Sequence, residues 1–417
     1  MKRVLIVGPV LSHSGYGEHA RFVLRALKSM PEEFDLFVRA IRWGETSWIW
    51  EDSEEREWID QLIAKSVNLT DSSPAFFDIS LQITVPQEWS KLARINIGVT
   101  AGTETTKISP RWLSHSLEMD RIIVVSEHSK SAFANTVHEF TNEYNVKTEV
   151  KLQKPVDVVG FPAKNIDATP IDLNLEHDFN FLMVGTWIPR KNIENTISWF
   201  IEEFQDQEVG LVIKTCLAKN SLRDRWHTAQ RLRGLVASIN PNAKCSIYLL
   251  HGDIPEAQMM GLYTHPKIKC LVNIAHGEGF GLPMFEAASV GLPIATVGWG
   301  GQLDYLTVSS PKSKKGAKKE LLYSRISSDI AQIKDHQAWD DVLYKDSQWA
   351  YAKEWHYKKT LRGIVKEYGT KKKLAEKLQK RIISEFSESK QNQKLCEAVL
   401  QALPSSDLSE ASEVLSI

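Results

Sequence analysis

The sequence predicts an α/β fold built from two doubly wound domains. Short runs of apolar, often β-branched residues alternate with stretches of helical periodicity along most of the chain. Strands that are apolar throughout and are each followed by a helix are typical of parallel sheets covered on both faces. A chain of 417 residues also exceeds what one hydrophobic core usually supports, so we expect two domains.

The candidate strands fall into two series, with helical patterns between them. The first series comprises residues 3–7, 35–39, 77–83, 95–99 and 122–125, and the second comprises 179–184, 209–214, 246–250, 270–274 and 294–297. Helices are predicted at 18–28, 129–139, 193–203, 223–239 and 256–263. Each series therefore supplies the sheet of one doubly wound domain.

Prolines and polar residues separate the two series and mark a linker. The expected organisation is an N-terminal domain at 1–160, a linker at 161–178, a second domain at 179–330, C-terminal helices at 331–402 and a frayed tail at 403–417. The helical pattern begins at Asp335, and we expect these helices to pack back across both domains. Ligands of open α/β sheets bind at the carboxyl ends of the strands, so a central cleft is expected where the two sheets face each other.

The composition indicates an ordinary globular protein with a formal net charge of −1. Attraction to a polyanion therefore has to come from local patches. The four cysteines show no C-x-x-C or metal-type spacing, which favours buried reduced thiols in a cytoplasmic protein. The N-terminal apolar run is too short for a signal peptide, and we expect no transmembrane helix.

The most informative segment follows the strand predicted at 270–274. It is rich in glycine and leads through Pro283 into a short helix. Gly279 and Gly281 let the backbone approach a ligand closely, and the helix N-terminus favours an anion such as a diphosphate. Glu278 and Glu286 flank this anion site, and their carboxylates are suitable acceptors for the hydroxyl groups of a sugar.

The nine residues from Glu278 to Glu286 resemble the E-x7-E signature of the retaining GT-B glycosyltransferases of family 4, with the EGFGLP core as a close match. Residues 291–296 and 300–301 agree with the family's next strand and glycine loop. The resemblance implies a GT-B fold and a nucleotide diphosphate sugar as donor. It implies that Glu278 contacts the transferred sugar as a catalytic residue and that Glu286 contacts the ribose. The diphosphate is then held by the backbone of Gly279, Phe280, Gly281 and Leu282.

Basic residues after two strands of the second domain fit the same interpretation. Arg190 and Lys191 follow the strand at 179–184, and both can neutralise a leaving diphosphate. Lys214, at the end of the next strand, is a weaker donor-binding candidate. Thr186 stands where the family usually carries an arginine.

The N-terminal domain is less typical of the family. Gly15 and Gly17 lie in a loop between the first strand and helix, which resembles the loop that closes on the donor phosphates. Relatives often carry a His-Asp pair after the strand at 95–99, and this chain has none there. Glu104 is the nearest candidate for orienting the acceptor hydroxyl, and Ser126 is expected to cap a helix.

The predicted activity is the transfer, with retention, of a hexosyl or pentosyl group to a hydroxyl of a glycan, lipid or small molecule. No D-x-D triplet is present, so we expect no metal and no other cofactor. Two alternatives stay open: transfer to hydroxymethylated bases of DNA, which would be extruded from the duplex, and a non-catalytic nucleotide-sugar-binding protein.

The acceptor partner is not specified by the sequence. An anionic membrane surface or DNA would suit two lysine clusters, namely Lys312, Lys314, Lys315, Lys318 and Lys319, and Lys371, Lys372, Lys373, Lys377, Lys380 and Arg381. A dense group of aromatic residues could stack on a sugar or a base or be buried against the sheet, and it consists of Trp43, Trp48, Trp50 and Trp58.

Overall fold

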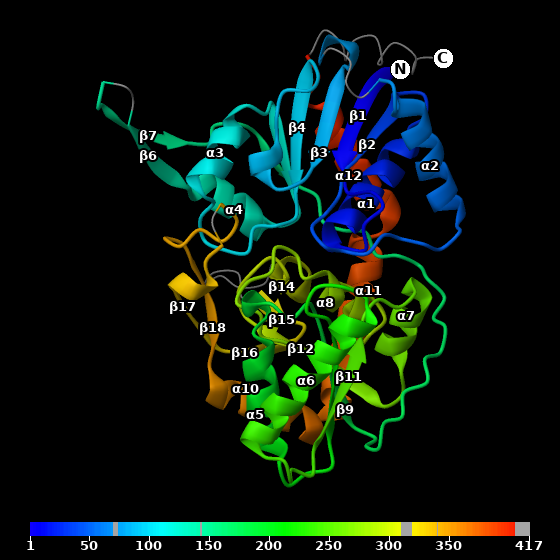
Figure 1. The fold of residues 1–417 in the computed structure, drawn as a ribbon, viewed down its shortest axis with the longest axis vertical. Helices are drawn as coiled ribbons and strands as arrows, with labels where there is room; N and C mark the ends of the chain where they lie inside the picture. Colours follow the sequence, from blue (N-terminus) through cyan, green and yellow to red (C-terminus); the bar gives the residue numbers. More distant parts are fainter. Residues whose placement is uncertain (70–73, 142–143, 310–318, 340, 405–417) are drawn as a thin grey trace. The chain divides into compact units, whose positions relative to one another are not determined.

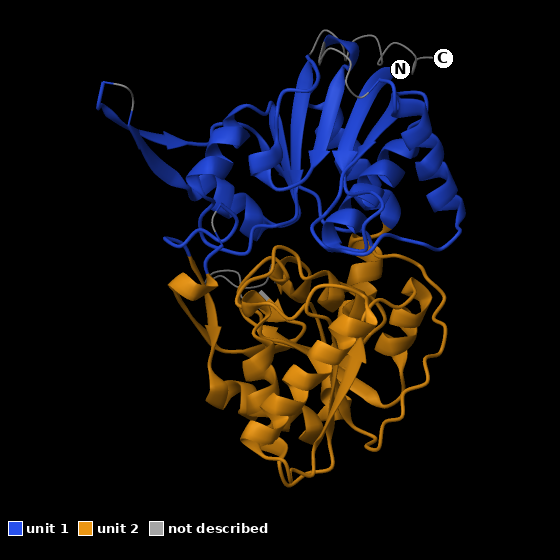
Figure 2. Cartoon of the chain, in the orientation of Figure 1, with its two compact units in different colours: residues 1–162, 338–347, 388–417 blue, residues 163–337, 348–387 orange. Residues whose placement is uncertain are grey.

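The computed structural model describes residues 1–69, 74–141, 144–309, 319–339 and 341–404. The chain forms two compact units, each described here by itself (Figure 2). Unit 1 contains Met1–Pro162, Ala338–Ser347 and the helix that begins at Glu388. Unit 2 contains Ala163–Gln337 and Gln348–Ser387.

Unit 1 is built on a parallel sheet (Figure 1). Its strands are, in spatial order, β2 (Phe34–Ala40), β1 (Lys2–Gly8), β3 (Ile79–Ile83), β4 (Ile95–Thr100), β5 (Arg121–Val124) and β8 (Val156–Val158). Its helices are α1 (Gly15–Lys28), α2 (Glu54–Ser66), α3 (Pro110–Leu117), α4 (Glu127–Asn135) and α12 (Glu388–Leu400). Leu395 and Val399 of α12 join Phe22 of α1 and the inner strands in one buried core. The last helix in sequence therefore completes the N-terminal sheet.

Unit 2 repeats the design with a second parallel sheet (Figure 1). The order is β11 (Ser246–His251), β10 (Gly210–Thr215), β9 (Asn180–Val184), β12 (Ile268–Asn273), β13 (Ile294–Val297) and β16 (Ser324–Ile326). The helices are α5 (Ile193–Phe204), α6 (Leu222–Ile239), α7 (Glu256–Thr264), α8 (Leu282–Ser289), α9 (Leu303–Leu306), α10 (Glu354–Lys366) and α11 (Tyr368–Glu385).

Short antiparallel pairs complete the structure. They are β6 (Val137–Thr141) with β7 (Lys147–Lys151), β14 (Thr307–Ser309) with β15 (Lys319–Leu321), and β17 (Ser328–Gln332) with β18 (Gln348–Ala352). The fold class predicted from the sequence is confirmed, because each unit is a doubly wound parallel sheet and helices follow at the C-terminal end.

The strand order of unit 2 reverses between β9 and β12. The chain runs outward from β9 through β10 to β11 and then returns to β12 on the other side of β9. The loops that follow β9 and β12 therefore leave neighbouring strands at the carboxyl edge of the sheet. Ligands of doubly wound sheets bind at this reversal point.

Two secondary-structure predictions are wrong at their ends. The helix predicted at 129–139 ends at Asn135, because the following β-branched residues continue into β6, which pairs with β7. The helical pattern predicted from Asp335 begins only at Glu354, because residues 348–352 form β18 against β17. Buried Trp349 anchors that strand. The tail from residue 405 and Lys312, Lys314, Lys315 and Lys318 lie outside the described residues.

Three of the four cysteines are buried as expected, and Cys216 is half-buried. All four are free thiols. Within the described ranges, none of the helices combines the length and the apolar character needed to cross a bilayer.

Candidate functional site

The glycine-rich loop after β12 turns sharply into α8. Gly281 caps the helix with φ +81°, a left-handed conformation in which a Cβ atom would lie 2.5 Å from Cε of Met284. Pro283 occupies the first turn, as predicted. The hydroxyl of buried Tyr305 donates a hydrogen bond of 3.0 Å to the carbonyl oxygen of Gly281. The hydrogen bond from Tyr305 thus fixes the turn, and the N-terminus of α8 lies at the carboxyl edge of the sheet.

Glu278 is the centre of a buried ion-pair cluster. Nζ of Lys191 donates to its Oε1 at 2.6 Å, and Nη1 of Arg190 lies 3.3 Å from its Oε2. Nδ2 of Asn273, the last residue of β12, donates to the same Oε1 at 3.1 Å. The side chains of Glu278, Lys191 and Arg190 are 7%, 12% and 14% exposed. The structure therefore brings together three of the residues predicted from the sequence.

The loop after β9 is held against the loop after β12 by hydrogen bonds from a side chain and from the backbone. Arg190 and Lys191 lie in the 3₁₀ turn Pro189–Lys191, which ends at Asn192 with φ +55°. The side-chain Nδ2 of Asn192 donates to the carbonyl of Ile274 at 3.3 Å, and the backbone N–H of His276 donates to the carbonyl of Arg190 at 2.8 Å. These bonds set the distance between the basic residues and Glu278.

His276 connects the same loop to β18. Its Nδ1 lies 2.7 Å from the carbonyl oxygen of Ala350, whose N–H donates to the carbonyl of His276 at 2.8 Å. The imidazole stacks on Trp349 with ring centroids 4.7 Å apart. Burial lowers the pKa of His276, so the ring stays neutral at pH 7. His276 therefore supports the loop as a structural residue.

The charge cluster keeps Glu278 ionised. Burial alone would raise the pKa of this carboxyl, but the neighbouring charges of Lys191 and Arg190 outweigh burial and lower it to about 2. The carboxylate is therefore a permanent hydrogen-bond acceptor at any physiological pH. A ligand hydroxyl that approaches it would meet an oriented, fully charged acceptor.

The glycine loop after β13 supports Glu278 from the other side. The N–H of Gly301 donates to the carbonyl of Glu278 at 2.8 Å. Gly300 has φ +114°, and a Cβ atom there would lie 3.1 Å from the same carbonyl oxygen. The predicted glycine pair thus allows a close backbone approach to the β12 loop.

Glu286 lies in the middle of α8 and is half-buried. The hydroxyl of Tyr263, on α7, donates to its Oε2 at 2.9 Å. Burial, followed by the charge of Glu286, raises the pKa of Tyr263 well above its usual value, so the phenol stays protonated as the donor. Glu286 is therefore held by a partner of its own, apart from the Lys191 cluster.

Lys214 lies at the carboxyl end of β10, beside Val184 of β9. Its carbonyl accepts a hydrogen bond of 3.1 Å from the N–H of Gly185, so its backbone fixes the start of the β9 loop. Its half-buried ammonium group joins no ion pair among the described residues. The structure places it one strand away from Lys191 without including it in the Glu278 cluster.

Gly15 and Gly17 belong to unit 1, at the start of α1, and they differ in surroundings. A Cβ atom on Gly17 would lie 2.0 Å from the carbonyl oxygen of Ser12. A Cβ atom on Gly15 would have no neighbouring atom within 4 Å. The side chain of Ser14 caps α1 by accepting from the N–H of Gly17 at 3.0 Å. Residue 17 must therefore be glycine because any side chain would clash with the loop itself. Of the two glycines, Gly15 is the one that borders open space.

Glu104 follows β4 of unit 1 and is half-buried. Nearby, the hydroxyls of Tyr16 and Thr100 share a hydrogen bond of 2.6 Å, and a Cβ atom on Gly102 would lie 2.6 Å from the Tyr16 oxygen. The pKa of Tyr16 is raised, chiefly by burial and also by the charge of Glu104. Ser126 caps α4 through the N–H of Ser129, as predicted.

Much of the lysine cluster on α11 is engaged in structure. Lys372 donates to the carbonyl of Gly291 at 2.7 Å, and Lys377 pairs with Glu320 at 2.5 Å. Arg381 donates to carbonyl oxygens at the end of α9, including that of Tyr305 at 2.7 Å. These contacts attach α11 to the rest of unit 2 and give three of the cluster's charges partners within it.

Three supporting residues were missed from the sequence, namely Asn273, Tyr263 and Tyr305. Asn273 carried a usable signal, because it is a polar residue in an otherwise apolar strand. Tyr263 on α7 contacts the carboxylate of Glu286, and Tyr305 on α9 contacts the carbonyl of Gly281. Because each partner lies in a different element, no local sequence pattern identifies these tyrosines.

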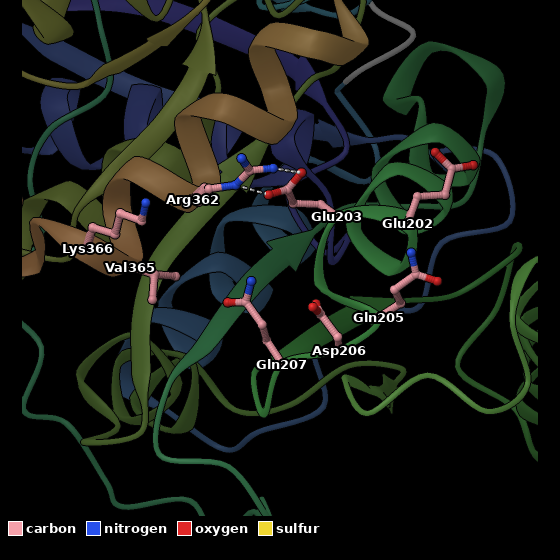
Figure 3. A pocket seen from close by; sticks show the side chains of 8 residues that line it. All are labelled: Glu202, Glu203, Gln205, Asp206, Gln207, Arg362, Val365 and Lys366. Atoms are coloured by element: carbon pink, nitrogen blue, oxygen red, sulfur yellow. Dashed lines mark hydrogen bonds and ion pairs between the residues drawn. The ribbon is translucent and has the colours of Figure 1, made fainter.

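A separate hollow lies between α5 and α10 (Figure 3). It is lined mainly by polar and charged side chains, and Arg362 is held there by two hydrogen bonds to Glu203, whose side chain is 4% exposed. The carboxylate of Glu203 and the guanidinium of Arg362 therefore satisfy each other at this hollow.

Comparisons with known proteins find similarity in structure only. No protein-family model matches the sequence, and no curated protein matches it. A sucrose-phosphate synthase from Thermosynechococcus elongatus is similar with a TM-score of 0.60 at 12% identity, over 96% of this chain and 99% of that one. HepE from Anabaena, solved with UDP and glucose, is similar with a TM-score of 0.55 at 13% identity, over 97% and 100%.

A trehalose-6-phosphate synthase gives a TM-score of 0.57 at 10% identity, over 96% of this chain and 100% of that one. At such low identities the similarity concerns the fold. The chain therefore has the fold of GT-B glycosyltransferases along nearly its whole length.

Proposed function

We propose that this chain is a retaining glycosyltransferase of family 4, which moves a sugar from a nucleoside diphosphate sugar to an acceptor hydroxyl. The observation that carries the proposal is the buried cluster of Glu278, Lys191 and Arg190 at the strand-order reversal of unit 2. A GT-B fold and a glycine-rich helix N-terminus beside the same cluster support it.

The leaving diphosphate would lie at the start of α8. The backbone of 279–282 and the helix dipole favour a dianion there, and Lys191 and Arg190 supply positive charge close by. As the bond between the sugar C1 and the diphosphate oxygen breaks, negative charge grows on the phosphate. Fixed positive charges in a buried site stabilise that charge without reorganisation, so no metal ion is required in this proposal.

Glu278 would contact the transferred sugar. Its carboxylate accepts from three protein donors and, being ionised, would also accept from a sugar hydroxyl. Glu286, held by Tyr263, would accept from the ribose hydroxyls of the nucleotide. The two carboxylates then orient opposite ends of the donor, with the diphosphate between them.

Transfer with retention would follow from attack on the face that the diphosphate leaves. The acceptor oxygen bonds to C1 while its proton passes to an oxygen of the departing phosphate, so that charge and atoms balance. Such a reaction depends mainly on positioning and on charge stabilisation, which the Glu278 cluster provides. The trehalose-6-phosphate synthase of the same fold was analysed for glycosyl transfer with retention.

The donor is tested by a thermal-shift screen against the diphosphate sugars of uridine, guanosine, adenosine and thymidine. UDP-glucose is the first probe, because HepE of similar fold was solved with it. A donor at about one hundred times its Kd should stabilise the folded protein by about 2.7 kcal/mol. The anomer of the transferred sugar, read by proton NMR with a chelator present, tests retention and independence of metals. A chain that none of these donors stabilises would refute the proposal.

A further inference from the structure

We propose that the extended segment Trp48–Ile49–Trp50 is a stacking platform for the acceptor, and that the acceptor is an uncharged saccharide. The inference rests on the proposed function and names the substrate class that it leaves open. Trp48 is 55% exposed and Trp50 is 69% exposed, unusual values for the largest apolar side chain. Ile49, between them, packs instead against the core of unit 1.

The segment is held in an extended conformation against the loop that precedes α1. Trp48 forms an antiparallel bridge with Ser12, and the N–H of Ile49 donates to the carbonyl of Leu11 at 2.8 Å. Side chains alternate along an extended chain, so the two indoles lie on the same side, opposite Ile49. Their Cα atoms are then about 7 Å apart. Two neighbouring exposed indoles thus lie on one side of the segment.

The platform lies at the carboxyl edge of the unit 1 sheet, where ligands of such sheets bind. The loop it pairs with follows β1 and leads directly to Gly15, which faces open space. Trp43, a few residues earlier, stacks on Tyr16 at 4.3 Å, and Tyr16 bonds to Thr100 at the end of β4. A chain of aromatic and hydroxyl contacts therefore runs from Trp43 to the buried end of β4.

The charges around the platform decide between ligands. Residues 42–57 carry two basic residues, Arg42 and Arg56, and six acidic residues, which are Glu45, Glu51, Asp52, Glu54, Glu55 and Glu57. Arg56 donates to the carbonyl of Ile49, and the net charge of the stretch remains strongly negative. Such a segment repels nucleic acid and anionic lipid surfaces, whose binding depends on Lys and Arg. Hydroxyl groups of a saccharide suit it, because carboxylates accept hydrogen bonds from them.

The indoles supply the remaining requirement of saccharide recognition. The C–H groups on one face of a sugar ring carry slight positive charge, and the face of an indole is negative. The half-buried Thr46, two residues before Trp48, shares one hydrogen bond of 2.6 Å with the hydroxyl of buried Ser12, and the Thr46 hydroxyl can exchange it for one with a sugar hydroxyl. A flat apolar face bordered by hydroxyls and carboxylates matches an uncharged oligosaccharide.

The test uses fluorine NMR of the full-length protein labelled with 5-fluorotryptophan. Trp48→Phe and Trp50→Phe assign the two resonances, and Trp355, which is 59% exposed on α10, is the reference. The probes are neutral oligosaccharides with glucose, galactose, mannose and N-acetylglucosamine backbones, a DNA duplex, and vesicles of phosphatidylglycerol. We expect at least one saccharide to shift both platform resonances and leave Trp355 unchanged. Shifts caused by DNA or vesicles in place of the saccharides, or by no probe, would overturn the assignment.

Kinetics with the saccharide that binds then separates the platform from the donor site. Trp48→Ala and Trp50→Ala should each raise the KM for the acceptor about tenfold, with the KM for the donor unchanged. Trp355→Ala should change neither constant. An unchanged acceptor KM would overturn the platform while leaving the donor assignment intact. A protein that binds the saccharides and no nucleotide sugar would instead refute the proposed function alone.

Discussion

Nζ of Lys191 lies 2.6 Å from Oε1 of Glu278, and the two side chains are only 12% and 7% exposed. They lie in the loops that follow β9 and β12, two strands that are neighbours only because the strand order reverses between them. This ion pair links the two loops. It also places charged groups where the proposed ligand would bind. Mutations at either residue should therefore change stability and chemistry together, and controls have to separate the two effects.

Glu278→Gln should abolish most turnover. The amide keeps the shape of the side chain but leaves two buried cations without a counter-charge and removes the charged acceptor. We expect kcat to fall by about 10²–10³. The free energy of unfolding, measured with urea, should fall by about 3–5 kcal/mol.

Glu203→Gln is the matched control for that change. Glu203 is also a buried carboxylate paired with an arginine, in the hollow between α5 and α10. The control should lose stability and keep its kcat. If Glu278→Gln transfers sugar at the wild-type rate, Glu278 has no part in the reaction.

Lys191→Met should change how the free energy of unfolding depends on pH in the acidic range. In the wild type the pKa of Glu278 is lowered to about 2 against an ordinary value of 4.5. A lowered pKa gives stability that is complete above 4.5 and is lost as the pH falls toward 2. Burial raises this pKa, and Lys191 is the largest influence that lowers it. Without Lys191 the folded-state pKa rises, so the loss of stability below pH 4.5 is smaller and is complete at a higher pH.

The measurement for Lys191→Met is Tm as a function of pH between about 2 and 6. The control is Lys358→Met. Lys358 lies on α10 and pairs with Glu202 of α5 and Glu354 of α10, away from the Glu278 cluster. Its profile should keep the wild-type shape. Identical acid limbs for Lys191→Met and the control would contradict the ion-pair explanation of the Glu278 pKa.

The residues around the β12 loop could be singled out from the sequence for a physical reason. Glycine, proline and the two glutamates occur within nine consecutive residues, so one local pattern defines the turn, the helix and both carboxylates. Lys191 was found because it follows a recognisable strand. Asn273 and Tyr263 were missed because their contacts depend on register and on packing between elements, which residue spacing does not encode. The same holds for β18, whose partner strand is separated from it in sequence.

Gly17→Ala should disrupt the loop that precedes α1, and Gly15→Ala should not. A methyl group at residue 17 would lie 2.0 Å from the carbonyl oxygen of Ser12, so the backbone has to move. We expect a loss of about 1–3 kcal/mol in the free energy of unfolding. The same measurement on Gly15→Ala should agree with the wild type within about 0.5 kcal/mol. If both variants lost the same free energy of unfolding, the clash with Ser12 would not explain the need for glycine at residue 17.

Tyr263→Phe should weaken donor binding without slowing the chemical step. The change removes the 2.9 Å hydrogen bond to Glu286, and the carboxylate is then less well oriented for a ribose. A hydrogen bond to a charged group contributes about 1.5–3 kcal/mol, so the donor KM should rise about tenfold at unchanged kcat. Tyr357→Phe removes an equally buried hydroxyl, which donates to the carbonyl of Thr196 at 2.9 Å, and it should affect stability alone. A donor KM that stays at the wild-type value in Tyr263→Phe would exclude Glu286 from nucleotide binding.

The most direct test of the central claim is calorimetric titration with the nucleoside diphosphate that the donor screen selects. The wild type, Lys191→Met and Lys358→Met are compared at one pH and ionic strength. If the loops after β9 and β12 bind the diphosphate, Lys191→Met should weaken the affinity about tenfold or more, and Lys358→Met should bind like the wild type. Equal affinities for all three proteins would contradict a diphosphate site at the Glu278 cluster.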